Sequence, residues 1–256
     1  MNRNLEMVRA PFERDGFVRT RLLDHPVHVN FLRNQREFLV NGISKPRPWH
    51  YAELHNPWSR AAKTYDSWGF LDLCCTPELL DRIEVVIGPD LILFDSQWVP
   101  DFRHSTRNDW ASDEDRLPVE PQVGVTALLS LSEWQSHGVR FDCLPGSHRE
   151  DAEPSPAFTI KVSPGDLLIF DPRLQYRISG EACDHHPIGY AIRYFPATSR
   201  YLRQRDLPLH RHLTELYPLV NYAQFPLWLV RGLDRAANDF VTGFNTRAGR
   251  WAGAAR

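Results

Sequence analysis

Cysteines and long apolar runs are scarce in this sequence, and both shortages exclude classes of protein. The four cysteines, Cys74, Cys75, Cys143 and Cys183, are too few and too irregularly spaced for a disulfide framework or a zinc site. We expect small buried thiols in a reducing compartment. No stretch approaches about 18 uninterrupted apolar residues, and the N-terminus lacks the apolar segment of a signal peptide. This pattern predicts a cytoplasmic protein with no membrane contact.

A charge excess of one sign is missing too. The formal net charge is −2, so no global positive field favours a nucleic-acid partner. Acidic and basic residues alternate within short runs such as residues 113–116 (DEDR), which we interpret as solvated surface. Repeats, low-complexity tracts and linkers are absent as well. A chain of 256 residues can bury a substantial core, and we predict one domain over residues 1–256.

The first third of the chain has helical signals. One helix is expected to end at Gly16, and a second covers residues 27–40 and is closed by residues 41–42 (NG). A third begins after Thr76 with a proline at its first position, and stops at Gly88. Residues 43–58 contain three prolines and are expected to form a loop.

From residue 90 onward the pattern changes to short strands. They are expected at residues 91–94, 123–131, 139–141, 158–162, 167–170 and 190–194. Helical spacing returns between residues 225 and 240. This order predicts a mainly β fold, a jelly roll (double-stranded β-helix) flanked by N-terminal and C-terminal helices.

Several short segments follow one another in a distinctive order: residues 12–18 (FERDGFV), 79–83 (LLDRI), 87–91 (IGPDL), 96–97 (SQ), 125–128 (VTAL), 144–148 (LPGSH), 165–171 (GDLLIFD) and 193–196 (RYFP). They resemble the phytanoyl-CoA dioxygenase family of iron- and 2-oxoglutarate-dependent oxygenases. Each is weak alone, but together they span roughly residues 10 to 200 in the family's order. The resemblance implies the jelly-roll fold and a site at the mouth of the barrel.

The family's iron ligands are a His-x-Asp pair and a distant histidine. Counted from residues 165–171, the distant histidine position holds Tyr176, and a neutral phenol is a much poorer iron ligand than imidazole. For the His-x-Asp pair two registers remain open. One places Arg107 and Asp109 at the two positions, the other His104 and Thr106, and neither restores the pair. The second register is similar to the halogenases of this superfamily, but those enzymes keep both histidines.

The arginine that holds 2-oxoglutarate in this family is also missing from its expected place. That place holds Pro187 or Ile188. Arg193 belongs to the Arg-Tyr-x-Pro ending of the family, which is not the usual clamp for the oxoacid. The resemblance, with these departures, implies that the protein uses neither iron nor 2-oxoglutarate. Fe(II) with 2-oxoglutarate remains the alternative cofactor set.

The candidate catalytic residues are Tyr176, His104 and Asp109. Tyr176 is expected to point into the barrel and to need a hydrogen-bond partner, for which Arg107 and Asp109 are the candidates. Two interpretations stay open: the tyrosine and an arginine fill the vacated metal cavity, or they bind or protonate a substrate there.

The candidate substrate-binding residues are Arg107 and Arg193, which would hold an anionic group, and Trp98 and Trp110, which would form walls. The leading hypothesis is a metabolite-tailoring enzyme that performs isomerisation, cyclisation or elimination. The alternatives are an iron and 2-oxoglutarate hydroxylase with atypical ligands, and a non-catalytic partner of an active homologous oxygenase. Its partner is expected to be a small-molecule substrate, and the chain is expected to form a homodimer or a heterodimer with such a homologue.

Overall fold

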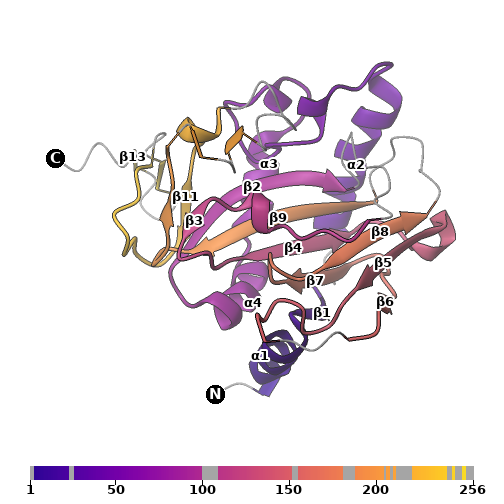
Figure 1. The fold of residues 1–256 in the computed structure, drawn as a ribbon. Helices are drawn as coiled ribbons and strands as arrows, with labels where there is room; N and C mark the ends of the chain where they lie inside the picture. The colour runs from indigo at the N-terminus through magenta and orange to yellow at the C-terminus, as the bar shows by residue number, and fades with distance from the viewer. Residues whose placement is uncertain are drawn as a thin grey trace.

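The computed structural model describes residues 3–22, 26–99, 109–151, 155–180, 188–204, 206–207, 210–211, 221–240, 244–245 and 250–251. Within these residues the α-helices come first in the chain. They are α1 (Arg3–Asp15), α2 (Pro26–Gly42), α3 (Ser67–Cys74) and α4 (Pro77–Ile87). The strands follow, with the exception of β1, and Figure 1 shows β2, β9, β4 and β7 running side by side through the molecule.

The major sheet has the strand order β1-β7-β4-β9-β2-β11-β12-β13. Its members are β1 (Phe17–Arg21), β7 (Asp166–Phe170), β4 (Val125–Ser130), β9 (Gly189–Pro196), β2 (Leu91–Val99), β11 (Trp228–Arg231), β12 (Phe244–Asn245) and β13 (Arg250–Trp251). All pairings from β1 to β11 are antiparallel. This arrangement confirms the predicted jelly-roll class.

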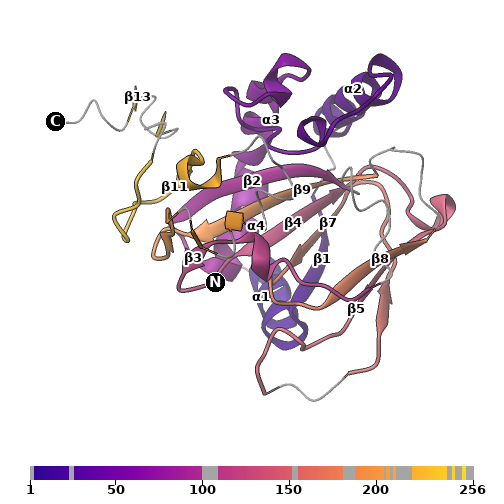
Figure 2. The same cartoon turned by 45° about the horizontal axis from the view of Figure 1, so that its top comes forward.

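Two smaller sheets complete the described fold. One has the order β6-β5-β8, with β6 (Phe158–Ile160), β5 (Val139–Cys143) and β8 (Tyr176–Gly180), and the other pairs β10 (Arg200–Tyr201) with β3 (Val119–Glu120). In Figure 2 the β5–β8 pair is seen as a layer apart from β4 and β7. The β6-β5-β8 sheet therefore faces the major sheet across an interior.

The two faces of the major sheet bury different side chains. One face, which we call the helix-covered face, packs Leu93, Ala127 and Ile192 against apolar residues of the four helices. The opposite face, the inner face, carries two separate apolar clusters, one around Leu128 and Phe170 and one around Phe94 and Phe195. Because consecutive strand residues point to opposite faces, the near-continuous apolar run of β4 is explained by burial on both sides.

Three helix ends lie where the local signals predict them, although the Thr76 side chain makes no capping hydrogen bond. Thr76 adopts an extended backbone before Pro77, and Gly88 ends α4 with a φ of 93°. Gly16 ends α1 with a φ of 82°, a conformation that glycine adopts without steric cost. Its amide donates to the Phe12 carbonyl, so the chain turns directly from α1 into β1.

The predicted C-terminal helix over residues 225–240 is wrong. This segment contains strand β11, which follows the 3-10 turn Tyr222–Gln224 and pairs with the start of β2. A short apolar run does not distinguish a buried strand from a buried helix by its spacing. Here the otherwise open edge of β2 at Leu91–Leu93 supplies hydrogen-bond partners to the segment, and Leu227 and Trp228 are fully buried. The segment covers the barrel instead of presenting an apolar patch.

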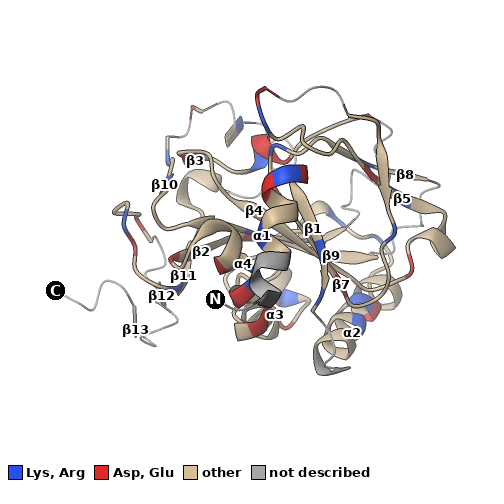
Figure 3. Cartoon of the chain, turned by 90° about the horizontal axis from the view of Figure 1, so that it is seen from below, with Lys and Arg blue, Asp and Glu red and all other residues tan. Residues whose placement is uncertain are grey.

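Charged residues of both signs are mixed on the side of the molecule that is seen from below in Figure 3, in agreement with the small net charge. The described cysteines, Cys74, Cys75 and Cys143, are free thiols. Among the described helices, none combines the length and the apolar character that crossing a membrane requires.

Candidate functional site: a buried arginine, aspartate and tyrosine network

Three polar side chains meet on the inner face because three strands are in register there. Arg193 on β9 lies opposite Asp95 on β2 and opposite Thr126 on β4. Directly opposed residues of neighbouring strands place their side chains on the same face, about 5 Å apart. The pairing of β2 with β9 shifts between Leu93 and Asp95, which brings Asp95 onto the inner face. Sheet register thus assembles a row of an acid, a base and a hydroxyl.

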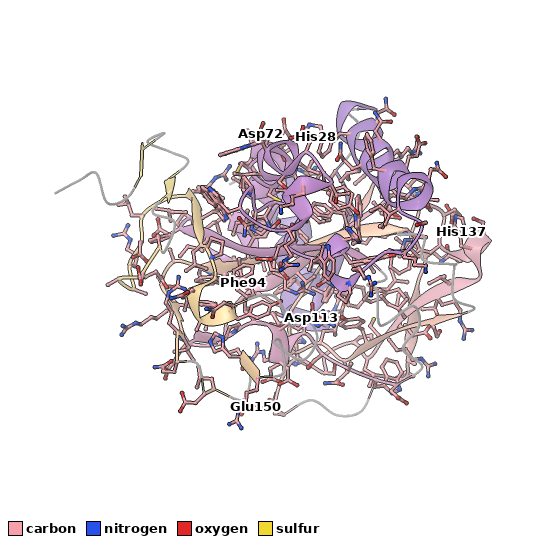
Figure 4. The ribbon with its side chains drawn as sticks, turned by 90° about the horizontal axis from the view of Figure 1, so that it is seen from above. His28, Asp72, Phe94, Asp113, His137 and Glu150 are labelled. Atoms are coloured by element: carbon pink, nitrogen blue, oxygen red, sulfur yellow. The ribbon has the colours of Figure 1, made fainter. Side chains whose placement is uncertain are left out.

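A short turn adds a second acid and a second base to this row. Asp113 precedes the 3-10 helix η3 (Glu114–Arg116), and its amide donates to the Pro172 carbonyl at 2.7 Å. Asp113 and Arg116 are three residues apart, so one turn brings both side chains to the same side. Asp113 is 1% exposed and Arg116 6% exposed, so both charges are buried. In Figure 4 the labelled Asp113 lies inside the molecule, whereas Glu150 lies at its margin.

Tyr176 reaches the same place from the β6-β5-β8 sheet. It is the first residue of β8, and its backbone exchanges hydrogen bonds with Ala111. Its ring stacks on Phe141 with the ring centres 5.1 Å apart, and the ring centre of Phe170 lies 5.2 Å from it. This packing fixes the hydroxyl, which donates to Asp113 Oδ1 at 2.7 Å.

Asp113 is the centre of the hydrogen bonding. Its Oδ2 accepts from Thr126 Oγ1 at 2.8 Å and from Arg193 Nε and Nη2 at 3.1 and 2.9 Å. Arg193 Nη1 in turn donates to Asp95 Oδ2 and to Gln97 Oε1, both at 3.2 Å. Arg116 donates to Gln97 Oε1 at 3.3 Å, and its Nε lies 3.6 Å from Asp113 Oδ1. We call these seven residues the inner network: Asp95, Gln97, Asp113, Arg116, Thr126, Tyr176 and Arg193.

The charges of the inner network balance, and this sets its protonation states. Burial alone would raise the pKa of Asp113, but Arg193, Arg116 and the hydrogen bonds from Tyr176 and Thr126 lower that pKa to about 2. Burial and the Asp113 charge raise the pKa of the Tyr176 phenol. Burial also raises the pKa of Asp95, although Arg193 opposes that shift. At neutral pH the network therefore holds an ionised Asp113 against a neutral Tyr176.

These side chains do not fit an iron ion. The facial triad needs two imidazoles and a carboxylate, and the inner network contains no imidazole. Two guanidinium groups lie beside its central carboxylate, where they would repel a dication. No three His, Cys, Asp or Glu side chains of the described residues come together in a way that would hold a metal. Asp113 instead uses both its oxygens for protein hydrogen bonds.

The structure brings together two of the predicted site residues, Tyr176 and Arg193. The partner of Tyr176 is Asp113, however, so the expectation of Arg107 or Asp109 as its partner is wrong for Asp109, which is exposed. Arg107 and His104 lie outside the described residues.

The two predicted wall residues have different positions. Trp110 is half-buried near the mouth, with the Arg177 guanidinium 4.7 Å from its ring centre. Trp98 does not line the inner face. It is fully buried on the helix-covered face, where its ring contacts Phe70 and Tyr190 at 5.5 and 5.7 Å. Its position in β2 alternates with Gln97, which belongs to the inner network.

Two network residues were misassigned by the sequence pattern. The charge-rich run at residues 113–116 is typical of solvated surface, but that prediction is wrong for Asp113 and Arg116. The i, i+3 spacing of the two charges was the available signal. Only the turn at residues 114–116 and its contact with Pro172 show that both face inward.

The fold has known counterparts among solved structures. CytC3 with Fe(II) and alpha-ketoglutarate superposes with a TM-score of 0.66 at 18% identity, covering 96% of this chain and 95% of that one. The non-heme alpha ketoglutarate dependent epimerase SnoN from nogalamycin biosynthesis gives 0.60 at 19% identity, covering 77% and 85%. The carbocyclase SnoK from the same biosynthesis, also described as non-heme alpha ketoglutarate dependent, gives 0.58 at 18%, covering 84% and 90%.

These likenesses define the class of fold. The chain has the jelly-roll fold of the non-haem iron and 2-oxoglutarate-dependent enzymes, and at identities below 20% the likeness shows the fold alone. No protein-family model matches the sequence, and no curated protein matches it.

Proposed function

We propose that this chain is a small-molecule tailoring enzyme that performs acid–base chemistry, such as isomerisation, cyclisation or elimination, without iron or 2-oxoglutarate. The observation that carries the proposal is the Arg193–Asp113–Tyr176 network at the place where the family resemblance puts the metal. Two of the structural neighbours, SnoN and SnoK, are described as an alpha ketoglutarate dependent epimerase and carbocyclase. They support the class of reaction, epimerisation or ring closure, whereas the absence of iron in the proposal rests on the side chains of the network.

Tyr176 is the member of the network through which a substrate would be met. It is half-buried, whereas the other six members are less than 9% exposed. Its proton is held by Asp113, so the phenol oxygen offers a fixed acceptor to a substrate hydroxyl or amide. Arg193 directs its hydrogen bonds to Asp95, Gln97 and Asp113. Its role in the proposal is therefore to hold the carboxylates, in place of the anion binding expected from sequence.

The proposal is tested on the purified full chain after treatment with a chelator. The protein is incubated with a small-molecule extract of the cells that encode it, and the mixture is compared by mass spectrometry with a heat-inactivated sample. We expect a product with the same mass as its precursor, or one that differs by a neutral loss such as water. Iron content and 2-oxoglutarate consumption are measured in parallel. Stoichiometric iron together with 2-oxoglutarate consumption would instead establish the hydroxylase with atypical ligands.

A second candidate function is that of a non-catalytic partner of a homologous oxygenase. It is favoured because the hydrogen bonds of Asp113 are satisfied within the protein. Asp113 has both oxygens bonded to protein groups, as expected if these side chains only fill a vacated cavity. This candidate predicts a stable complex with a homologue and no turnover by the isolated chain. A monomer that copurifies with nothing and turns over its substrate would rule it out.

A further inference from the structure

Glu53 has a backbone conformation that its side chain does not favour. Its φ is 55°, in the left-handed region where glycine is at ease and a β-carbon causes strain. The neighbours of Glu53 force this conformation, because Ala52 bridges to Gln97 and the Leu54 amide donates to the Ser96 carbonyl. Glu53 is the extra residue between these two contacts with β2. Strain of this kind persists where the surrounding structure imposes it, and it concentrates at functional sites.

Glu53 follows directly on a residue that contacts the inner network, because Ala52 bridges to Gln97. Ala52 packs with Phe94 and Phe195 on the inner face, and the charge of Asp95 acts on the Glu53 carboxyl. Glu53 and Asp95 also both act on the Tyr201 phenol, which belongs to the same inner cluster. Glu53 therefore stands next to the part of the network that β2 supplies, Gln97 and Asp95.

One carboxyl oxygen of Glu53 is left for a ligand. Oε1 accepts from Asn56 Nδ2 at 3.3 Å, and among the described residues Oε2 has no hydrogen-bond partner. The loop is fixed through its backbone, because the Asn56 amide and the Ser59 hydroxyl both donate to the Glu53 carbonyl. Glu53 is half-buried as a residue, and burial is the main influence on its carboxyl.

We infer that Glu53 is the proton-transferring residue of the proposed site, because a strained, firmly held loop presents its one unpartnered carboxyl oxygen beside the inner network. The inference rests on the proposed function. Ionised Glu53 takes a proton from a C–H or O–H group of the substrate, and the bonding electron pair stays on the substrate. The neutral carboxylic acid then returns the proton to another atom on the same face of the substrate, so the reaction needs no oxidant.

The protonation equilibrium of Glu53 suits this task. Burial, and next the negative charge of Asp95, raise its pKa to about 7, while the Asn56 hydrogen bond opposes the shift. The charged group of β2 that acts on Glu53 is Asp95, which is itself paired with Arg193. On β10, Tyr201 carries the Arg203 guanidinium over its ring. A proton-transfer group works best when its pKa lies near the working pH.

The test compares three variants that separate strain from chemistry. Glu53→Gln keeps the shape and removes the proton transfer, whereas Glu53→Gly also removes the strain. Ala237→Gly is the matched control, because Ala237 has a φ of 53° on an exposed loop away from the network. We expect both glycine variants to melt roughly 2–4 °C higher than the wild type. Turnover of the chelator-treated protein should fall by about 10²–10⁴-fold in both Glu53 variants and stay unchanged in Ala237→Gly.

A chemical probe tests the carboxyl without any substrate. Carbodiimide with glycine methyl ester couples to protonated, reachable carboxyls, and the labelled peptides are quantified by mass spectrometry. At pH 6.5 we expect Glu53 to be labelled more than the exposed Glu37, and its labelling to fall when the pH is raised above 8. Absence of label on Glu53 while Glu37 reacts would overturn the inference.

The two proposals fail in different ways. Wild-type turnover in Glu53→Gln, measured with chelator present, overturns the role of Glu53 and leaves the metal-independent function standing. A wild-type chain with no turnover in chelator overturns the proposed function, and the role of Glu53 falls with it.

Discussion

The Tyr176 hydroxyl connects the half-buried mouth of the barrel to a fully buried ion pair, and this link can be cut by removing one atom. Tyr176→Phe leaves Asp113 with its bonds to Thr126 and Arg193. We expect it to lower the free energy of unfolding by about 1 kcal/mol and to abolish most turnover.

The matched control for this change is Tyr65→Phe. The Tyr65 hydroxyl donates to the His50 carbonyl at 2.9 Å, away from the inner network. A similar loss of stability with full turnover is expected, as measured by urea unfolding and by the chelator-treated assay. Equal turnover in both variants would remove Tyr176 from the site.

Asp113 makes one specific contribution to how the stability of the protein responds to acid. Its pKa falls from an ordinary 3.8 to about 2 in the folded state, so the unfolded chain binds the proton more readily. The stabilisation is present above pH 4 and is lost as the pH falls toward 2, a loss of about 2 kcal/mol. Urea unfolding of the wild type at pH 5 and pH 2.5 measures this loss.

Asp113→Asn should show a smaller difference between these two pH values, on a fold already weakened by an uncompensated buried arginine. Asp151→Asn, which changes an exposed carboxylate, keeps the contribution of Asp113 and serves as the comparison. An unchanged acid response in Asp113→Asn would mean that the Arg193 pairing does not hold in solution.

At the scale of residues, the sequence predicts which residues belong to the site better than it predicts their hydrogen-bond partners. The motif at residues 165–171 locates Tyr176, and Arg193 follows from its own motif, so one half of the network was accessible. The role of Asp113 could not be predicted, because its burial depends on a turn that contacts Pro172, 59 residues further along the chain. Glu53 gave no signal either, since a left-handed glutamate is imposed by pairing with β2 and not by its own preference.

At the scale of elements, the junction of α1 and β1 depends on one glycine. A β-carbon at Gly16 would stand 2.5 Å from His148 Nδ1 and 3.0 Å from Leu174 Cδ1, on a backbone of φ 82°. We expect Gly16→Ala to reduce the free energy of unfolding by roughly 2–4 kcal/mol, from backbone strain and overpacking together.

The control is Gly42→Ala at the end of α2, where a β-carbon meets no atom within 4 Å. It should be neutral, or stabilising by up to about 1 kcal/mol. Denaturant unfolding of both variants measures the difference. If Gly16→Ala were as stable as the wild type, the α1 cap would not restrain β1.

Helices and strands with strong local sequence signals could be predicted. Strands that form only because they pair with another strand could not. The helix after Thr76 and the strand at residues 125–130 follow from a proline, a glycine and an apolar run. Strand β11 follows from the vacant edge of β2, which no local pattern contains. The same holds for the bulge that turns Asp95 inward.

At the scale of the whole molecule, the order of helices and strands was enough to predict the jelly roll, because that order is what the architecture requires. Whether the buried carboxylates need a metal ion can be judged only from the side chains that surround them in the interior. Two buried arginines and two buried aspartates already neutralise one another there, so the fold does not depend on an ion to compensate its carboxylates.

This charge balance predicts the thermal response of the full chain. A ligand that binds only the folded state at 100 times its Kd would add about 2.7 kcal/mol, or roughly 5–10 °C in a chain of this size. We expect Fe(II) and 2-oxoglutarate together, added anaerobically, to shift the melting temperature by less than about 1 °C. Each ligand alone is the control for unspecific effects. A rise of several degrees that requires both would mean that residues outside the inner network complete an iron site, and the acid–base proposal would then give way to the oxygenase.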